Sequence, residues 1–165
     1  MFMSKNESKL LIDNLSKNQV VLEWGTGDST VEIGKIVREV YSIEHLKKWY
    51  DKIKKRVTSN VKLFLCPVTM KNKRIDGDLD EFKEYVEKPL EFDEKFDLIL
   101  IDGRARYECG KIAHQLADEN TKVFIHDFTI PPQKGREDYN KLLEYFDIVE
   151  HIERLILLKK KEKKK

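Results

Sequence analysis

The sequence lacks the features that mark membrane, disulfide-rich and metal-binding proteins. No stretch comes near the roughly 18 consecutive apolar residues that a membrane span needs, and the first residues contain no apolar segment typical of a signal peptide. The two cysteines, Cys66 and Cys109, lie in a strand-like and a helix-like apolar run, outside any CxxC or histidine pattern. We therefore expect reduced, buried thiols and a cytoplasmic protein without a membrane span.

The chain lacks a net positive charge outside its last residues. Residues 159–165 hold six lysines and one glutamate, so the remainder is slightly acidic although the whole chain carries +2. Proteins that bind nucleic acid through its phosphates usually carry positive charge on the folded surface, so we expect no nucleic-acid partner. The length predicts one domain over residues 1–158. We expect residues 159–165 to be a disordered tail that folding does not require; docking on an anionic partner or lipid surface is the alternative.

Short apolar runs alternate with helical patterns along the chain. The helical patterns cover residues 9–15, 29–38, 45–57, 79–86, 104–116 and 137–145. The strand-like runs cover residues 20–22, 40–43, 61–66, 96–101 and 123–125, and residues 148–152 and 155–158 suit a hairpin. This alternation predicts an α/β fold with a doubly wound, mainly parallel seven-stranded sheet and an antiparallel C-terminal hairpin.

Polar residues follow the predicted strands at the point where each strand ends. In doubly wound sheets, ligands bind outside the carboxyl ends of the strands, where the strand order reverses. The residues in these places are Glu23, Glu44, Cys66, Asp102, His126 and Asp127. Most of them are ionisable, which is more polarity than a merely structural set of loops needs.

The first of these loops contains Gly25 and Gly27 and resembles part of a dinucleotide-binding fingerprint, with Glu44 placed to bind a ribose. The third glycine of that fingerprint is absent, because Thr30 stands there. Glu23 would repel a pyrophosphate, whereas S-adenosylmethionine has no phosphate and carries an ammonium and a sulfonium group that favour nearby negative charge. A glycine turn without a ligand is the alternative.

Four segments together resemble the motifs of the class I S-adenosylmethionine-dependent methyltransferases. They are LEWGTGDST at residues 22–30, SIEH at 42–45 followed by Trp49 and Tyr50, DGRARYEC at 102–109, and HDF at 126–128. The likeness spans about residues 20 to 150 and implies a Rossmann-like fold with S-adenosylmethionine as cofactor.

The resemblance also implies roles for individual residues. Glu44 would accept hydrogen bonds from both ribose hydroxyls, and His45 or Val68 would border the adenine, with a solvent-facing His45 as the alternative. Trp49 would be a core residue or an adenine wall. Asp102 would lie beside the transferable methyl group. The methionine part would lie in the loop formed by Glu23, Trp24, Gly25, Thr26, Gly27 and Ser29.

The acceptor side departs from the pattern of related sugar and small-molecule O-methyltransferases. These often have Asp-Gly-x-His-x-Tyr after the fourth strand, whereas this chain has Ala105 in place of the histidine. The base that removes the acceptor's proton would then be Asp102, His126 or Asp127. Alternatively, Asp102 and Asp127 would share a Mg²⁺ ion that acidifies the hydroxyl.

Arg104 and Arg106 lie next to this predicted site. Guanidinium groups bind carboxylates and phosphates through paired hydrogen bonds, so the two residues suit an anion clamp for substrate; a salt bridge to Glu108 or another surface acid is the alternative. We therefore expect O-methylation of a small polar acceptor, such as a sugar or nucleotide-sugar. The competing hypothesis is a non-catalytic module that binds S-adenosylmethionine or a nucleotide and serves as a scaffold.

Overall fold

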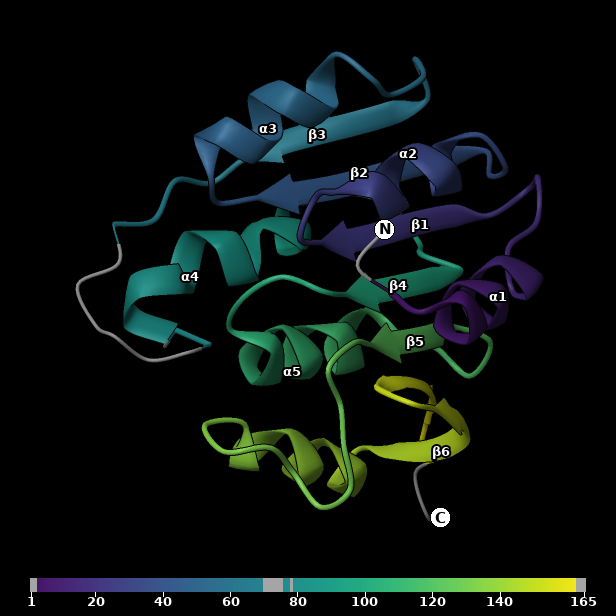
Figure 1. Cartoon of the computed structure of the whole chain (residues 1–165), viewed down its shortest axis with the longest axis vertical. Helices are drawn as coiled ribbons and strands as arrows, with labels where there is room; N and C mark the ends of the chain where they lie inside the picture. The colour runs from purple at the N-terminus through teal and green to yellow at the C-terminus, as the bar shows by residue number, and fades with distance from the viewer. Residues whose placement is uncertain (1–2, 70–75, 78, 163–165) are drawn as a thin grey trace.

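Seven strands form the central sheet of the computed structural model, which describes residues 3–69, 76–77 and 79–162 (Figure 1). Their order across the sheet is β3-β2-β1-β4-β5-β7-β6. The strands are β1 (Val20–Trp24), β2 (Glu39–Glu44), β3 (Val61–Leu65), β4 (Leu98–Ile101), β5 (Lys122–Ile125), β6 (Phe146–Ile152) and β7 (Leu155–Lys160).

The first five strands are parallel, and β7 is antiparallel to both β5 and β6. Every residue of β1 and of β4 is buried, as expected for central strands that are covered on both faces. This arrangement confirms the predicted doubly wound, mainly parallel sheet with an antiparallel C-terminal pair.

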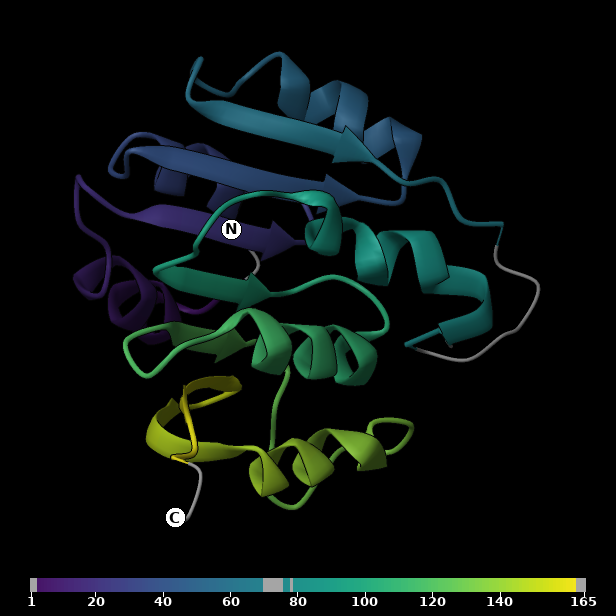
Figure 2. The same ribbon diagram turned by 180° about the vertical axis from the view of Figure 1, so that it is seen from behind.

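Helices cover both faces of the sheet, and each face buries its own cluster of apolar side chains. Figures 1 and 2 show α1 and α2 on one face and α4, α5 and η2 on the other. The helices are α1 (Lys5–Asp13), α2 (Asp28–Gly34), α3 (Lys47–Lys54), α4 (Leu79–Glu87) and α5 (Arg106–Leu116), with 3-10 helices η1 (Lys88–Glu91) and η2 (Glu137–Glu144).

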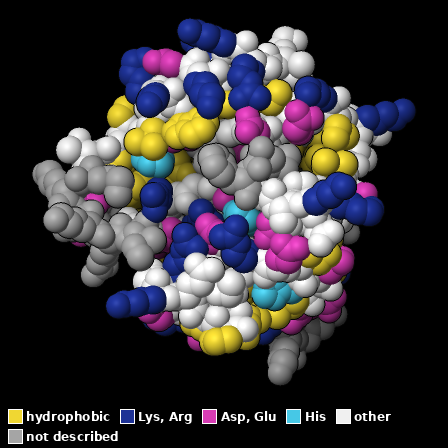
Figure 3. Space-filling model, in the orientation of Figure 1, with side chains coloured by type: hydrophobic (Ala, Val, Ile, Leu, Met, Phe, Trp, Pro, Cys, Tyr) yellow, Lys and Arg dark blue, Asp and Glu magenta, His cyan; other side chains and the backbone are white. Residues whose placement is uncertain are grey.

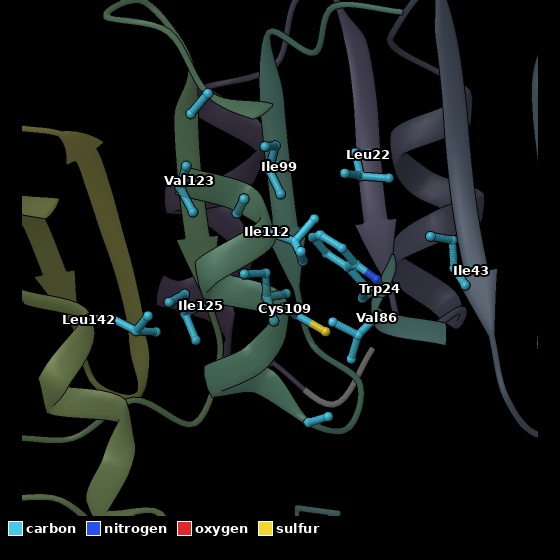
Figure 4. Packing of buried hydrophobic residues seen from close by; sticks show 14 of the residues in the cluster. Leu22, Trp24, Ile43, Val86, Ile99, Cys109, Ile112, Val123, Ile125 and Leu142 are labelled. Atoms are coloured by element: carbon cyan, nitrogen blue, oxygen red, sulfur yellow. The ribbon is translucent and has the colours of Figure 1, made fainter. Parts of the chain in front are cut away.

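Apolar packing fixes α5 against the sheet. Figure 4 shows Cys109 and Ile112 of this helix beside Trp24, Ile99 and Val123 from three neighbouring strands, and all five are buried. Burying a side chain of this size contributes about 1.5–3 kcal/mol. The packing therefore also fixes the position of the loop that joins β4 to α5.

The strand order reverses at β1, because the chain moves outward to β3 and then returns to β4 on the other side of β1. The loops that follow β1 and β4 touch at this point. Gly25 has φ +95°, and a Cβ atom there would lie 2.6 Å from the backbone nitrogen of Gly103. Glycine is therefore required at position 25, and the two loops border the same region.

The helix predicted for residues 29–38 is wrong at both ends. It begins at Asp28, with Gly27 as its N-cap, and ends at Gly34. The side-chain amide of Asn60 donates hydrogen bonds to the carbonyls of Gly34 and Val37, at 2.9 and 3.0 Å. These bonds satisfy the carbonyls at the helix end, and they come from a residue that a local pattern does not include.

The helix predicted from Arg104 begins two residues later, at Arg106. Ala105 precedes it in a left-handed conformation with φ +49°. The carboxylate of Asp76 then accepts a hydrogen bond from the backbone nitrogen of Arg106, at 2.9 Å. The start of α5 is thus capped by a residue from the loop before α4.

The helix predicted for residues 45–57 covers only Lys47–Lys54, and Ile53 is buried in it. Residues 137–144 form a 3-10 helix in place of the helix predicted there.

Strand β7 extends to Lys160, so the sheet includes two residues of the predicted tail. Lys159 pairs with Lys122 of β5. The ammonium group of Lys160 donates hydrogen bonds to the carbonyls of His114 and Ala117, both at 2.8 Å. The ordered domain therefore extends past the predicted boundary at residue 158, and residues 163–165 lie outside the described residues.

Both cysteines are free and buried, which confirms the expectation for them. Burial raises the pKa of the Cys66 thiol to about 11 and that of the Cys109 thiol well above its ordinary value, so both stay protonated. Among the described helices, none has the length and apolar character that crossing a membrane requires.

Candidate functional site

An open cleft of about 340 Å³ lies at the carboxyl ends of the central strands. It is lined by Gly25, Thr26, Gly27, Asp28, Ser29, Glu44, His45, Leu46, Trp49, Asp102, Gly103, Arg104, Arg106, Asp127 and Arg136. In the middle of the face shown in Figure 3, acidic and basic side chains lie side by side around a histidine. The cleft therefore includes most of the site residues predicted from the sequence.

Glu44 lies at the end of β2 and binds the backbone of the glycine-containing loop that follows β1. Its Oε2 accepts a hydrogen bond from the backbone nitrogen of Thr26, at 3.0 Å. Its Oε1 accepts bonds from the backbone nitrogens of His45 and Leu46, at 2.9 and 2.8 Å. A carboxylate has about four acceptor sites, so Glu44 can still accept about one further bond, from a ligand hydroxyl in the cleft.

Glu23 lies beneath the loop and does not line the cleft. It is fully buried, and its carboxylate accepts hydrogen bonds from the hydroxyls of Ser29, Thr30 and Ser42, at 2.6, 2.5 and 2.7 Å. Burial raises the pKa of Glu23 to about 7, although the three hydroxyls oppose this change. Glu23 can thus act on a bound cation only through the loop that covers it.

Aromatic and apolar side chains form the wall beside Glu44. His45 is 7% exposed, and its ring lies edge-on against Phe82 and Tyr85, so the solvent-facing alternative for it is wrong. Leu46 and Trp49 line the cleft next to it.

Besides Glu23, two residues predicted to contact the cofactor lie outside the cleft. Trp24 is fully buried in the core, where its indole nitrogen donates to the Tyr85 carbonyl at 3.0 Å. Val68 packs against the core from the loop after β3.

His126 lies behind the opposite wall of the cleft. It is 3% exposed, and its Nδ1 lies 2.9 Å from Oδ1 of Asp102. Asp102 itself lines the cleft at the end of β4. Of these two candidate bases, Asp102 is therefore the one that a ligand can reach.

Asp127 is surrounded by three guanidinium groups. Its carboxylate lies 3.0 Å from Arg106, 2.9 Å from Arg154 and 3.3 Å from Arg136. Burial raises the pKa of Asp127, but the charges of Arg106, His126, Arg136 and Arg154 outweigh burial and hold the pKa below its usual value. Asp127 is accordingly a weak base.

Arg106 lines the cleft, as expected for the predicted substrate clamp, but it is buried between the two aspartates. Its guanidinium lies 3.5 Å from Asp102 and 3.0 Å from Asp127, and it donates to the carbonyls of Gly103 and His126. These partners occupy most of the N–H donors of Arg106, so few donors remain to bind a substrate.

The geometry argues against the Mg²⁺ alternative. Asp102, His126 and Asp127 offer ligand atoms within 4.8 Å of one another. However, Arg106 already places a positive charge between the two carboxylates, and Arg136 and Arg154 also pair with Asp127. A divalent cation in the same place would meet these three cations, so the residues present do not fit a metal.

No protein-family model and no curated protein sequence matches this chain. Solved structures do match. A methyltransferase-like protein from Silicibacter pomeroyi superposes with a TM-score of 0.78 at 18% identity, over 97% of this chain and 87% of that one. An rRNA methylase from Streptococcus thermophilus gives 0.63 at 13% identity, over 98% and 99% of the two chains. A tRNA (m1A58) methyltransferase from Aquifex aeolicus gives 0.63 at 18% identity, over 99% and 71%.

The chain has the Rossmann-like methyltransferase fold. The seven-stranded sheet with its antiparallel C-terminal pair lies within the part that superposes on these neighbours, which covers 97% to 99% of this chain. Identities of 13% to 18% establish the fold but leave the activity to be argued from the cleft.

Within this methyltransferase fold, the structure adds residues that the sequence did not single out. Arg136 lines the cleft from the long loop after β5, and Leu46 lines it from the start of α3. Glu7 of α1 lies 3.3 Å from the ring of His126, 119 residues away. Ser4 and Glu7 show the capping-box spacing, which could have predicted the start of α1 but not the contact with His126.

Arg106→Ala should destabilise the protein by about 3–5 kcal/mol, because it removes a buried guanidinium that two partly buried carboxylates, Asp102 and Asp127, share. Urea unfolding followed by circular dichroism measures this change. Arg56→Ala is the control, since the Arg56–Asp28 pair is largely exposed and such pairs contribute about 0–1 kcal/mol. Equal losses for the two variants would show that Arg106 is not a structural counter-charge.

The stability that Glu23 contributes should decrease as pH rises from about 4.5 to 7. The folded protein binds a proton at Glu23 with a pKa of about 7, against 4.5 for an ordinary glutamate. Over this window the folded state therefore binds more protons than the unfolded state, and the loss is at most about 3 kcal/mol. The wild-type free energy of unfolding minus that of Glu23→Gln should fall across the window and level off above it. A difference independent of pH would contradict this account.

Proposed function

We propose that this protein is an S-adenosylmethionine-dependent methyltransferase that methylates a hydroxyl group of a small, anionic, sugar-like acceptor. The observation that carries the proposal is the meeting of three features in one cleft: the Gly25–Gly27 loop, Glu44 at the end of β2 and Asp102 at the end of β4. This cleft lies where ligands bind in doubly wound sheets.

The loop side of the cleft suits a cationic cofactor without phosphates. Asp28 and Glu44 line this side, and Glu23 lies directly beneath it. The backbone of Thr26 and Gly27 would border the methionine part. Glu44 would accept a bond from a ribose hydroxyl, and Leu46 and Trp49 would flank the adenine. S-adenosylmethionine supplies a methyl group on a sulfonium centre, which nearby carboxylates stabilise electrostatically.

The opposite side suits the acceptor, with Asp102 as the general base. Of the three candidates, His126 lies behind the wall and Asp127 is held by three arginines. Asp102 lines the cleft, and its described contacts involve Oδ1, so Oδ2 is the atom we assign to receive the hydroxyl proton. The acceptor oxygen then bonds to the methyl carbon as the bond from carbon to sulfur breaks.

Arginines at this side favour an anionic acceptor. Arg104 and Arg136 line the cleft together with Asp102. Arg106 is 7% exposed and pairs with both Asp102 and Asp127, whereas Arg136 lies at 3.3 Å from Asp127 and lines the cleft. We therefore assign the anion contact to Arg104 and Arg136 in place of the Arg104–Arg106 pair. A carboxylate or phosphate on a sugar has the charge and the planar or branched oxygens that guanidinium groups bind.

A transfer assay with methyl-labelled S-adenosylmethionine tests the proposal. Pools of neutral sugars, phosphorylated sugars, nucleotide-sugars, tRNA and rRNA serve as acceptors, and label should enter the anionic sugar pools. Asp102→Asn should then lower turnover by about 10²–10⁴-fold while S-adenosylhomocysteine binds normally. Asp138→Asn, which removes the same charge at an exposed position, should leave turnover unchanged.

Three other outcomes of the transfer assay would each reject a different part of the proposal. Label in tRNA or rRNA would keep the methyltransferase and reject the sugar-like acceptor; the rRNA and tRNA enzymes among the neighbours show that the fold itself does not select the acceptor. Binding of S-adenosylhomocysteine without transfer to any pool would favour the scaffold hypothesis. Full turnover by Asp102→Asn would reject Asp102 as the base.

A further inference from the structure

His126 connects Asp102 to a second carboxylate on the far side of its ring. Nδ1 lies 2.9 Å from Oδ1 of Asp102, and Nε2 lies 3.3 Å from Oε2 of Glu7. His126 and Glu7 are 3% and 1% exposed. The ring is thus enclosed between one carboxylate that lines the cleft and another that does not reach it.

Glu7 is held firmly by α1 and by the hairpin at the other end of the chain. Its Oε2 accepts a hydrogen bond from the backbone nitrogen of Ser4 at 2.7 Å, and its Oε1 accepts one from the backbone nitrogen of Arg154 at 2.8 Å. Burial raises the pKa of Glu7, but these two bonds and the charge of His126 outweigh it and lower the pKa. Glu7 therefore faces the ring as a carboxylate.

The surroundings of the ring are mainly negative. Besides Glu7 and Asp102, Oδ1 of Asp127 lies 3.9 Å from Nδ1. Positive charge comes from Arg106, which donates to the backbone carbonyl of His126, and from Arg136 and Arg154, which pair with Asp127. Burial lowers the pKa of His126, but its hydrogen bond with Asp102 and the three carboxylate charges outweigh burial and raise the pKa. A charged ring has N–H groups on both nitrogens and can donate to both carboxylates at once.

We propose that Glu7, His126 and Asp102 act as one unit, in which Glu7 fixes the ring of His126 and the ring orients Asp102 toward the acceptor hydroxyl. Glu7 is then a positioning residue for methyl transfer, and this role rests on the proposed function. Without the ring, Asp102 would be free to turn toward Arg106, which lies 3.5 Å from the same Oδ1 atom. The unit would keep Oδ2 available for the proton.

Glu7→Gln tests the unit, because glutamine keeps the size of the side chain and one of its two acceptor oxygens but removes the charge beside Nε2. Ser4→Ala is the matched control: it removes the hydroxyl that caps Glu7's nitrogen at 3.2 Å and weakens the same helix, yet leaves the Glu7 carboxylate in place. The full-length chain with ¹⁵N-labelled histidine is titrated by NMR for each variant. In parallel, calorimetry measures S-adenosylhomocysteine affinity.

Glu7→Gln should lower the titration midpoint of His126 by about one pH unit or more, whereas Ser4→Ala should leave it within a few tenths of a unit. With the acceptor found in the transfer assay, Glu7→Gln should lower kcat by about tenfold or more without changing the KM for S-adenosylmethionine. Ser4→Ala should retain the wild-type kcat at temperatures where both variants are folded.

An unchanged His126 titration in Glu7→Gln, or equal losses of kcat in the two variants, would overturn the unit while leaving the methyltransferase proposal intact. Failure of the wild-type protein to bind S-adenosylhomocysteine would instead reject the proposed function, and the positioning role with it.

Discussion

The buried guanidinium of Arg106 is the constraint on which the acceptor side of the molecule depends. Burying a charge costs several kcal/mol unless partners compensate it closely. Here the partners come from the loops after β4 and β5, since Asp102 and Asp127 pair with the guanidinium and the carbonyls of Gly103 and His126 accept its remaining bonds. One side chain at the start of α5 thereby joins the ends of two strands.

The same network sustains backbone conformations that are unfavourable by themselves. Ala105 and Asp127 have φ angles of +49° and +56°, which cost an L-residue roughly 1–2 kcal/mol each. Ala105 lies directly before Arg106, and Asp127 is one of its partners. The ion pairs can offset the conformational free energy of these two residues, because the pairs form only when both loops adopt these backbone conformations. This network forms one wall of the cleft, in which the ring of His126 contacts Asp102 on the side away from the cleft.

The sequence predicted the sheet well because buried parallel strands produce apolar runs that are visible without any tertiary knowledge. It also placed Glu44 and Asp102 at strand ends, where their side chains line the cleft. Arg106 shows the limit of this approach, because a sequence pattern does not reveal whether an arginine beside an aspartate will face substrate or be buried against it. Trp24 shows the same limit, since a residue within the glycine motif can direct its side chain to the core.

Contacts between distant segments were not predictable for a related reason. Asn60 binds the end of α2 from 26 residues away, and Asp76 caps α5 from 30 residues away. Glu7 reaches His126 across most of the chain. In each case a polar side chain bonds to a group that comes within reach only after the sheet has formed. Local sequence periodicity therefore cannot predict these contacts.

The cleft has an acidic side beside the glycine loop and an arginine-rich side beside Asp102, which suits a cationic cofactor and an anionic acceptor. Calorimetry with S-adenosylhomocysteine and NAD, measured side by side, tests this claim most directly. The account predicts that S-adenosylhomocysteine binds, that NAD does not, and that Glu44→Ala weakens binding by about 1–3 kcal/mol through lost hydrogen bonds to a charged group. Glu39→Ala, at the other end of β2, should bind as the wild type does. Binding of NAD without binding of S-adenosylhomocysteine would contradict the account.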